Sequence, residues 1–128
     1  MDIYAAIGYR LLNDTDITDV VGGRVYHGMR PEGDAPCINY FEVSYQPLHN
    51  GVLEVPRYQI SCRAATAGAA EDLGRMVAVL FHNFQGTIAG FDIQRATVLG
   101  KMLIPEPSTD LYHVPVDVML VYNESTVT

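Results

Sequence analysis

Four histidines are the residues of this 128-residue chain best suited to bind a transition metal. His27 and His49 fall in predicted loops, His82 on the polar side of a predicted helix, and His113 at the entry to the last predicted strand. Two imidazoles on one helical face need a spacing of four residues, and no two of these histidines have it. The sequence therefore predicts no metal site built on histidine.

An acidic group near the amino terminus, Asp14, Asp16 and Asp19, loosely resembles the spacing of a calcium-binding loop. Such a loop also needs a central glycine and a glutamate at its twelfth position, and this segment has neither. Short polar side chains that accept hydrogen bonds from backbone amides are equally typical of the start of a helix. Capping of a short helix explains these aspartates at least as well as calcium does, and we expect no metal.

The sequence also has no glycine-rich loop of the kind that binds phosphate groups. Gly22-Gly23 and the pair Gly86 and Gly90 lack the spacing of nucleotide-binding loops, and neither stands between a strand and the amino terminus of a helix. We found no nucleophile with an adjacent base and no paired carboxylates in a predicted cleft. The sequence therefore predicts a protein without cofactors and without enzymatic activity.

The two cysteines, Cys37 and Cys62, stand 25 residues apart, with no second ligand at metal-binding spacing. We interpret them as small buried hydrophobic residues of a protein in a reducing compartment. A disulfide between neighbouring strands is the alternative.

The charge balance excludes a further class of function. The chain has 15 acidic and 8 basic residues, a formal net charge of -7, and a single lysine, Lys101. Proteins that bind nucleic acid through its phosphates, or stack its bases beside a basic groove, need clustered Lys and Arg. The acidic surplus is typical of a soluble surface, and it would also suit a lining past which DNA moves without adhering.

Hydrophobic periodicity predicts two main helices. In Ala67–Gln85, large apolar residues recur at helical spacing, with Thr66 placed to cap the start and Gly86 to end the helix. In Asp2–Leu12, apolar residues recur at every fourth position, and the first residue can cap the free amides. A shorter helical segment is expected at Asp16–Val21.

Strands are predicted where apolar and polar residues alternate. Cys37–Tyr45 carries apolar or aromatic groups on both faces, so we expect this strand to be covered on both sides. In Arg57–Ala64, one face is apolar and the other, which carries Ser61 and Arg63, is polar and expected to be wet. The loop Gln46–Pro56 between them contains Asn50-Gly51, a strong hairpin signal.

Two further strands follow the long helix. In Gly90–Leu99, the alternation slips between Ile93 and Ala96, as a β-bulge would produce. Pro105–Ser108 is typical of a turn, and the last strand, Val114–Tyr122, places a valine-rich row on one face.

These elements define an α+β fold with two layers, in which a mainly antiparallel sheet of about four to five strands packs against two helices. We expect residues 1–123 to form a single domain and residues 124–128 to be a polar tail. We expect no secretory leader, and the given sequence contains no apolar run near 18 residues that could span a membrane.

Several segments resemble a known family, that of the bacteriophage tail completion, or tail terminator, proteins. They are Asp2–Ile7 with Leu11-Leu12, the Val21-Gly22 turn running into Arg24–Tyr26, the strand start at Pro36, Ile38 and Tyr40, the strand Arg57–Ala64 followed by a helix with Ala69, Ala70 and Leu73, and the ending Tyr112–Val118. The likeness extends over nearly the whole chain.

The resemblance implies a structural virion protein with no catalytic residues. It implies a ring, of six subunits, that terminates the tail tube in the neck region of the virion and joins it to the head completion ring. The implied partners are further copies of this chain, the tail tube protein and the head completion or connector protein, with assembly in the host cytoplasm. DNA would pass through the ring without specific binding.

Two segments are candidate contact surfaces. The loop Pro47–Val55 carries apolar residues on a predicted hairpin tip, where they either fold onto their own sheet or contact a partner. The extended piece Arg24–Tyr26 could pair with a neighbouring subunit as a sheet edge. The candidate interface residues are Leu48, His49, Val52, Leu53, Glu54, Arg24, Val25 and Tyr26.

Two alternatives remain open from the sequence. A head completion protein or a tail tube protein of the same virion would share ring symmetry and acidic composition. A small dimeric α+β enzyme or ligand-binding domain belongs to a different class, and it would need convergent polar groups between the helix and the sheet.

Overall fold

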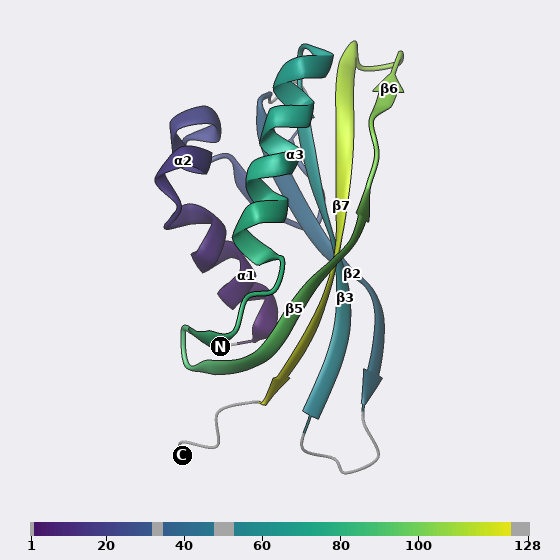
Figure 1. Ribbon diagram of the computed structural model, residues 1–128. Helices are drawn as coiled ribbons and strands as arrows, with labels where there is room; N and C mark the ends of the chain where they lie inside the picture. The colour runs from purple at the N-terminus through teal and green to yellow at the C-terminus, as the bar shows by residue number, and fades with distance from the viewer. Residues whose placement is uncertain (1, 32–34, 48–52, 124–128) are drawn as a thin grey trace.

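The computed structural model describes residues 2–31, 35–47 and 53–123, and within these ranges the chain forms three α-helices and one seven-stranded sheet (Figure 1). The helices are α1 (Ile3–Leu12), α2 (Thr15–Val21) and α3 (Ala67–Phe81). The strands are β1 (Val25–His27), β2 (Cys37–Pro47), β3 (Leu53–Ala64), β4 (Gly86–Ile88), β5 (Phe91–Lys101), β6 (Ile104–Glu106) and β7 (Leu111–Asn123).

The strands of the sheet follow the order β1-β2-β3-β7-β5-β4, and β6 pairs with β7 beside β5. β1 runs parallel to β2, whereas every other pair is antiparallel. The α+β class is confirmed, but the sheet is mixed and has more strands than expected. β4 and β6 were missed because three residues are too few to show an alternating pattern.

All three helices lie on one face of the sheet, and the core is between the two layers (Figure 1). The predicted apolar face of β3 is confirmed, because Tyr58, Ile60, Cys62 and Ala64 are all buried. The valine-rich row of β7 is buried as well; it comprises Val114, Val116, Val118, Leu120 and Tyr122. Alternation on the two central strands therefore supplies most of the sheet side of the core.

The helices come close to the sheet at two glycines. A Cβ atom at Gly8 of α1 would lie 2.5 Å from the hydroxyl oxygen of Tyr40, which donates a hydrogen bond to the carbonyl of Tyr4 (2.8 Å). A Cβ atom at Gly74 of α3 would lie 2.6 Å from Cγ1 of Val114. Both distances are shorter than carbon contacts allow, so each helix sits where only glycine leaves room.

Helix α3 ends at Phe81, four residues before the predicted end. Asn83 adopts a left-handed conformation (φ 61°), and the chain then exchanges backbone hydrogen bonds with Ala96 of β5. Arg10 of α1 donates two hydrogen bonds to the carbonyl of Leu80 and stacks over the ring of Phe84 at 3.7 Å. Tertiary contacts therefore end the helix before Gly86, the predicted stop.

The helix starts agree with the capping predictions in two of three cases. Thr66 accepts a hydrogen bond from the amide of Ala69 at the start of α3. Asp14 accepts one from the amide of Ile17 at the start of α2, which confirms its capping role. Asp2 occupies the cap position of α1, but its side chain makes no capping hydrogen bond.

The bulge predicted in β5 is confirmed by a register shift between Ile93 and Arg95. The predicted loop Gln46–Pro56 was too long, because β2 continues to Pro47 and β3 begins at Leu53. Pairing between these strands extends the hairpin past both prolines. The dipeptide Asn50-Gly51 and the tail 124–128 lie outside the described residues.

Two further strand predictions need correction. β2 is buried on both faces only over Cys37–Tyr40, and Glu42–Ser44 are exposed beyond the last helical cover. The turn predicted at Pro105–Ser108 begins two residues later in the structure, because Ile104–Glu106 pairs with β7 as strand β6. In both places, neighbouring elements determine the burial or pairing of the segment, and the local sequence pattern does not encode them.

Cys37 and Cys62 are buried, as predicted, and neither forms a disulfide bond. Cys37 faces Arg63 across the β2–β3 pair and Cys62 faces Ile38, so the two thiols lie on opposite faces of the sheet. Burial raises the pKa of the Cys62 thiol well above its ordinary value. Among the described residues, no helix is long and apolar enough to cross a bilayer.

Candidate functional site

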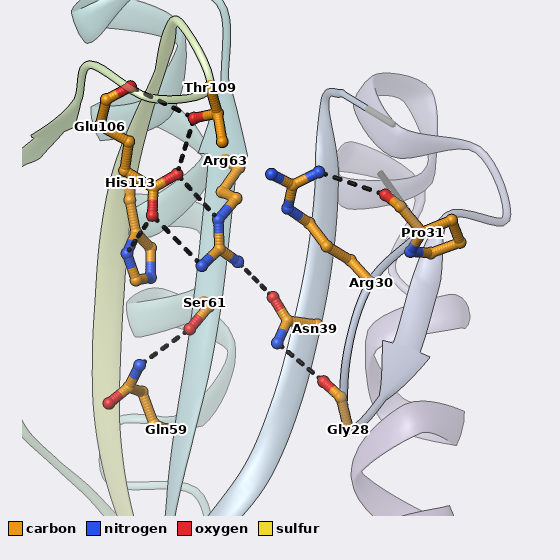
Figure 2. A network of polar contacts seen from close by, with 10 residues as sticks. All are labelled: Gly28, Arg30, Pro31, Asn39, Gln59, Ser61, Arg63, Glu106, Thr109 and His113. Atoms are coloured by element: carbon orange, nitrogen blue, oxygen red, sulfur yellow. Dashed lines mark hydrogen bonds and ion pairs between the residues drawn. The ribbon is translucent and has the colours of Figure 1, made fainter. Parts of the chain in front are cut away.

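The densest group of polar side chains lies on the open face of the sheet, opposite the helices, and Figure 2 shows it. Arg63 of β3 is its centre. The guanidinium donates to both carboxylate oxygens of Glu106 (3.2 and 3.4 Å) and to the amide oxygen of Asn39. Asn39 in turn donates to the carbonyl of Gly28 (2.8 Å). The network therefore links the segment after β1 to β2, β3 and β6.

The remaining partners of Glu106 close the network at the β6–β7 turn. Thr109 donates to Oε1 of Glu106 (3.2 Å), and Nδ1 of His113 lies 3.4 Å from Oε2. Cross-strand register creates this meeting, because Arg63 stands directly opposite His113, and His113 opposite Ile104 near Glu106.

Burial and charge set the protonation of this group. Burial and the neighbouring Arg63 cation lower the pKa of His113 to about 4, so its imidazole is neutral at pH 7. Burial alone would raise the pKa of Glu106, but the hydrogen bonds and charge of Arg63 lower it below the ordinary value. The result is one ion pair, Arg63–Glu106, beside a neutral histidine.

This arrangement serves structure and has no evident chemistry. The side chains of Arg63 and Glu106 are only 15% and 22% exposed, and each neutralises the other. Nε2 of His113 is buried with no hydrogen-bond partner among the described residues, which leaves it no access to a substrate. No group of three metal-ligating side chains comes together in the described ranges.

The prediction that the polar face of β3 is wet is therefore wrong at Ser61 and Arg63. Ser61 is fully buried and accepts a hydrogen bond from Gln59 (3.0 Å), and Arg63 is mostly covered. Asn39, Glu106 and His113 are the residues that sequence reasoning missed. They stand on three different strands, and only the register brings them together, so no local spacing could have indicated them.

Elsewhere on the open face, a hollow of about 430 Å³ lies beside the partly exposed ion pair of Arg57 and Asp117. Its rim includes the exposed apolar side chains Val43 and Met102. The hollow is wide open, and its lining residues Arg57 and Asp117 are already paired with each other, so it lacks the enclosure of a small-molecule site.

Among the described strands, β1 pairs with β2 alone and so lies at an edge of the sheet. Arg24 does not extend outward from it. Its guanidinium donates to the carbonyls of Pro36 (2.8 Å) and Val20 (3.3 Å) and so fixes β1 to its own chain. Val25 packs against the core, and Tyr26 is partly buried.

Of the other candidate interface residues, Leu48, His49 and Val52 lie outside the described residues. Leu53 begins β3, and Glu54 pairs with Tyr122 across the β3–β7 ladder. Oε2 of Glu54 is buried without a hydrogen-bond partner in the described part of the chain. The contact role assigned to this hairpin stays a prediction.

Two of the remaining histidines have structural partners. His27 stacks on Tyr4 with ring centroids 4.0 Å apart, in β1 and not in the loop that the sequence predicted. His82 follows the end of α3, and its Nδ1 accepts a hydrogen bond from the amide of Val98 (3.1 Å). These contacts hold elements together and bring no histidines into a shared site.

The geometry defines an α+β protein in which the polar network of the open face links neighbouring strands of the sheet. The sequence model of the family described as "Tail completion protein gp17" matches residues 5–123. The chain therefore belongs to the tail completion family. It is a structural component of a bacteriophage-type tail, found in the virion, and not an enzyme.

A solved structure titled "Virion of native gene transfer agent (GTA) particle" contains a chain of similar fold. The two chains share 15% sequence identity and a TM-score of 0.73, over 93% of this chain and 92% of that chain. At this identity the similarity shows a shared fold. A search of curated proteins gives no match.

Proposed function

We propose that this protein forms a closed ring, of six subunits, that terminates the tail tube and joins it to the head completion ring. Membership of the tail completion family over residues 5–123 is the observation that carries the proposal. The fold similarity to a chain of a gene transfer agent virion, over nearly the whole of both chains, supports the same setting.

The sheet supports assembly into a ring because its two ends differ. β1 is the edge at one end, and β5 with the short β4 forms the edge at the other. Two different edges suit a head-to-tail contact, in which each subunit presents one edge to each neighbour. Such contacts close into a ring when the rotation between subunits divides a full turn.

The charge distribution supports passage of DNA without adhesion. Of the seven arginines, six donate to oxygen atoms of their own chain: Arg10, Arg24, Arg30, Arg57, Arg63 and Arg75. Against a formal net charge of -7, no clustered basic groove is present among the described residues. A ring of such subunits repels a phosphate backbone more than it attracts it.

The β2–β3 hairpin is the proposed contact with an adjacent ring. Both strands extend past the helical layer at the lower end of the view in Figure 1. Glu42, Val43 and Ser44 are exposed along this extension. A projecting hairpin without helical cover is suited to contact another component of the tail.

The test is the size of the assembly, measured by light scattering on the eluate of a size-exclusion column and by negative-stain imaging across a concentration series. Closed rings of six subunits are expected, alone or once the tail tube protein is added. Open tubes that lengthen with concentration would instead identify a tube component. A stable dimer that persists with the tube protein would contradict the proposal and favour the ligand-binding alternative.

A further inference from the structure

A hollow of about 290 Å³ lies on the open face of the sheet, beside the end that β1 forms. Its lining residues are Met29, Arg30, Asn39 and Arg63. Met29 and Arg30 follow β1 in the chain, and the carbonyl of Gly28, just before them, accepts a hydrogen bond from Asn39 (2.8 Å). Two guanidinium groups therefore border one small hollow next to the sheet edge.

Arg30 approaches Arg63 without pairing to a carboxylate among the described residues. Figure 2 shows its side chain reaching over β2 toward Arg63. Nη1 of Arg30 donates to the carbonyl of Pro31 (3.2 Å), while Nε and Nη2 donate to no described residue. Burial is the main cause of the lowered pKa of His113, and the charges of Arg63 and Arg30 both add to it. Arg30 therefore brings a second positive charge to this group.

The local charges do not cancel. Arg63 pairs with Glu106 through Nε and Nη2, and its Nη1 points to Asn39, the side on which Arg30 lies. His113 is neutral at pH 7. Two cations and one carboxylate leave one unit of positive charge, in a chain whose formal net charge is -7. Like charges held close together cost free energy, and a bound anion offsets that cost.

A carboxylate fits this hollow better than a phosphate dianion does. One negative charge balances the local excess, whereas two exceed it beside the carboxylate of Glu106. A planar guanidinium presents paired N–H donors that match the two oxygens of a carboxylate. Met29 is 93% exposed at the hollow, where its flexible side chain can cover the apolar stem of an acidic residue. An aspartate or glutamate of another protein chain has this combination of charge and stem.

We propose that this hollow receives an acidic side chain from the next copy of this chain. The hollow borders the β1 edge, which the proposed ring assigns to one neighbour, so the inference rests on that ring and adds a charge contact to it. The chain can supply the acid, because exposed residues such as Asp19, Asp92 and Asp110 make no ion pair with a described residue. A buried opposite charge also orients one subunit on the next.

Carbodiimide cross-linking of an Arg30→Lys variant tests the contact. The reagent activates a carboxylate, and a contacting lysine amine then attacks it to form an amide, releasing the reagent as a urea. The original chain has a single lysine, Lys101, so few other amines compete. The protein is assembled, alone or with the tail tube protein, from equal parts of isotope-labelled and unlabelled chain. In mass spectrometry, links between copies then include pairs of one labelled and one unlabelled peptide.

Arg75→Lys is the matched control. Arg75 lies on α3, belongs to neither sheet edge nor to the β2–β3 hairpin, and donates to Asp72 of its own chain (2.9 Å). This variant should give a link within one copy, between position 75 and Asp72, and so shows that the reaction proceeds at a contacting pair. Circular dichroism and thermal unfolding establish that each variant is folded.

The expected result is a link from position 30 to an acidic residue of another copy, present in the assembled protein and absent at concentrations too low for assembly. Neutral substitutions should agree with it. Arg30→Gln should need a roughly tenfold higher concentration to form rings, because it removes one partner of the charge contact. Arg75→Gln should assemble as the original protein does.

Three results would overturn the inference. Links from position 30 only to acids of its own copy would show that the chain itself supplies the carboxylate; the acids include Glu106, and Glu32 and Asp34, which lie outside the described residues. Links only to the tube protein would replace the second copy as partner. No link at position 30, while the Arg75→Lys control reacts, would leave the hollow without a carboxylate. All three leave the proposed ring standing, whereas failure of the original protein to form rings with the tube protein counts against the ring itself.

Discussion

The two faces of the sheet are held in different ways. The face under the helices is dry, and its side chains are aliphatic or aromatic, packed so closely that two helical glycines cannot carry a Cβ atom. The open face is polar, and its upper end depends on one ion pair, Arg63–Glu106, with two hydrogen-bonded neighbours. Close packing of apolar side chains therefore stabilises the covered face, whereas an ion pair and its hydrogen bonds stabilise the upper end of the open face.

This contrast explains why one face could be predicted and the other could not. A close-packed layer leaves a periodic signal in the chain, since each strand places every second residue in it. A polar network between four strands leaves none, because each strand contributes only one or two of its members. Substitutions and changes of pH should therefore alter the free energy of unfolding differently on the two faces.

The largest effect is expected on the covered face. Phe81→Ala removes a ring that is fully buried between α3 and the sheet, and it should lower the free energy of unfolding by about 3–5 kcal/mol. Met102→Ala on the open face removes a side chain that is 64% exposed and should change it by less than about 0.5 kcal/mol. Urea unfolding followed by circular dichroism measures both. Similar losses would show that the open face is packed against something in solution.

The next effect tests the ion pair of the open face. Arg63→Met leaves Glu106 and the amide oxygen of Asn39 without their donor and should cost roughly 2 kcal/mol, since the pair is mostly covered. Adding Glu106→Gln removes the unpaired charge and should recover part of the loss. A double-mutant cycle measured by urea unfolding gives the coupling. Additive losses would mean that the two side chains do not interact in solution.

The pH dependence should come from His113. Its pKa is lowered from about 6.5 to about 4 in the folded protein, so the unfolded chain binds a proton first as the pH falls. Stability is therefore complete above pH 6.5 and decreases towards pH 4, by about 2 kcal/mol between pH 7 and pH 5. The lowered pKa of Glu106 acts in the same direction, below its unfolded value of about 4.5. His113→Gln should remove most of the change between pH 7 and pH 5, and an unchanged pH profile would contradict this.

Sequence alone predicted the covered face well. Alternation identified the buried rows of β3 and β7, helical spacing identified the start and inner face of α3, and a slip in parity identified the bulge after Ile93. Each of these signals is local, because a residue's burial in a regular element depends on its position within that element.

What the sequence missed depends on contacts between distant segments. The end of α3 is set by Arg10 and by backbone hydrogen bonds to Ala96, which stand far from it in the chain. Arg63 was predicted to be wet because nothing near it in the sequence indicates that Glu106 and Asn39 cover it.

The smallest effect distinguishes close packing from helix propensity on the covered face. Gly68 and Gly74 both lie in α3, but a Cβ atom at Gly68 meets nothing within 4 Å, whereas one at Gly74 meets Val114. Gly68→Ala should stabilise the protein by about 0.5 kcal/mol through lower chain entropy in the unfolded state. Gly74→Ala has the same gain but must displace Val114, so it should destabilise by about 1 kcal/mol. Thermal unfolding of the two variants gives opposite signs if contact with β7 sets the position of α3. If both substitutions stabilise the protein, α3 has room to shift away from Val114, and close packing does not fix the position of this helix on the sheet.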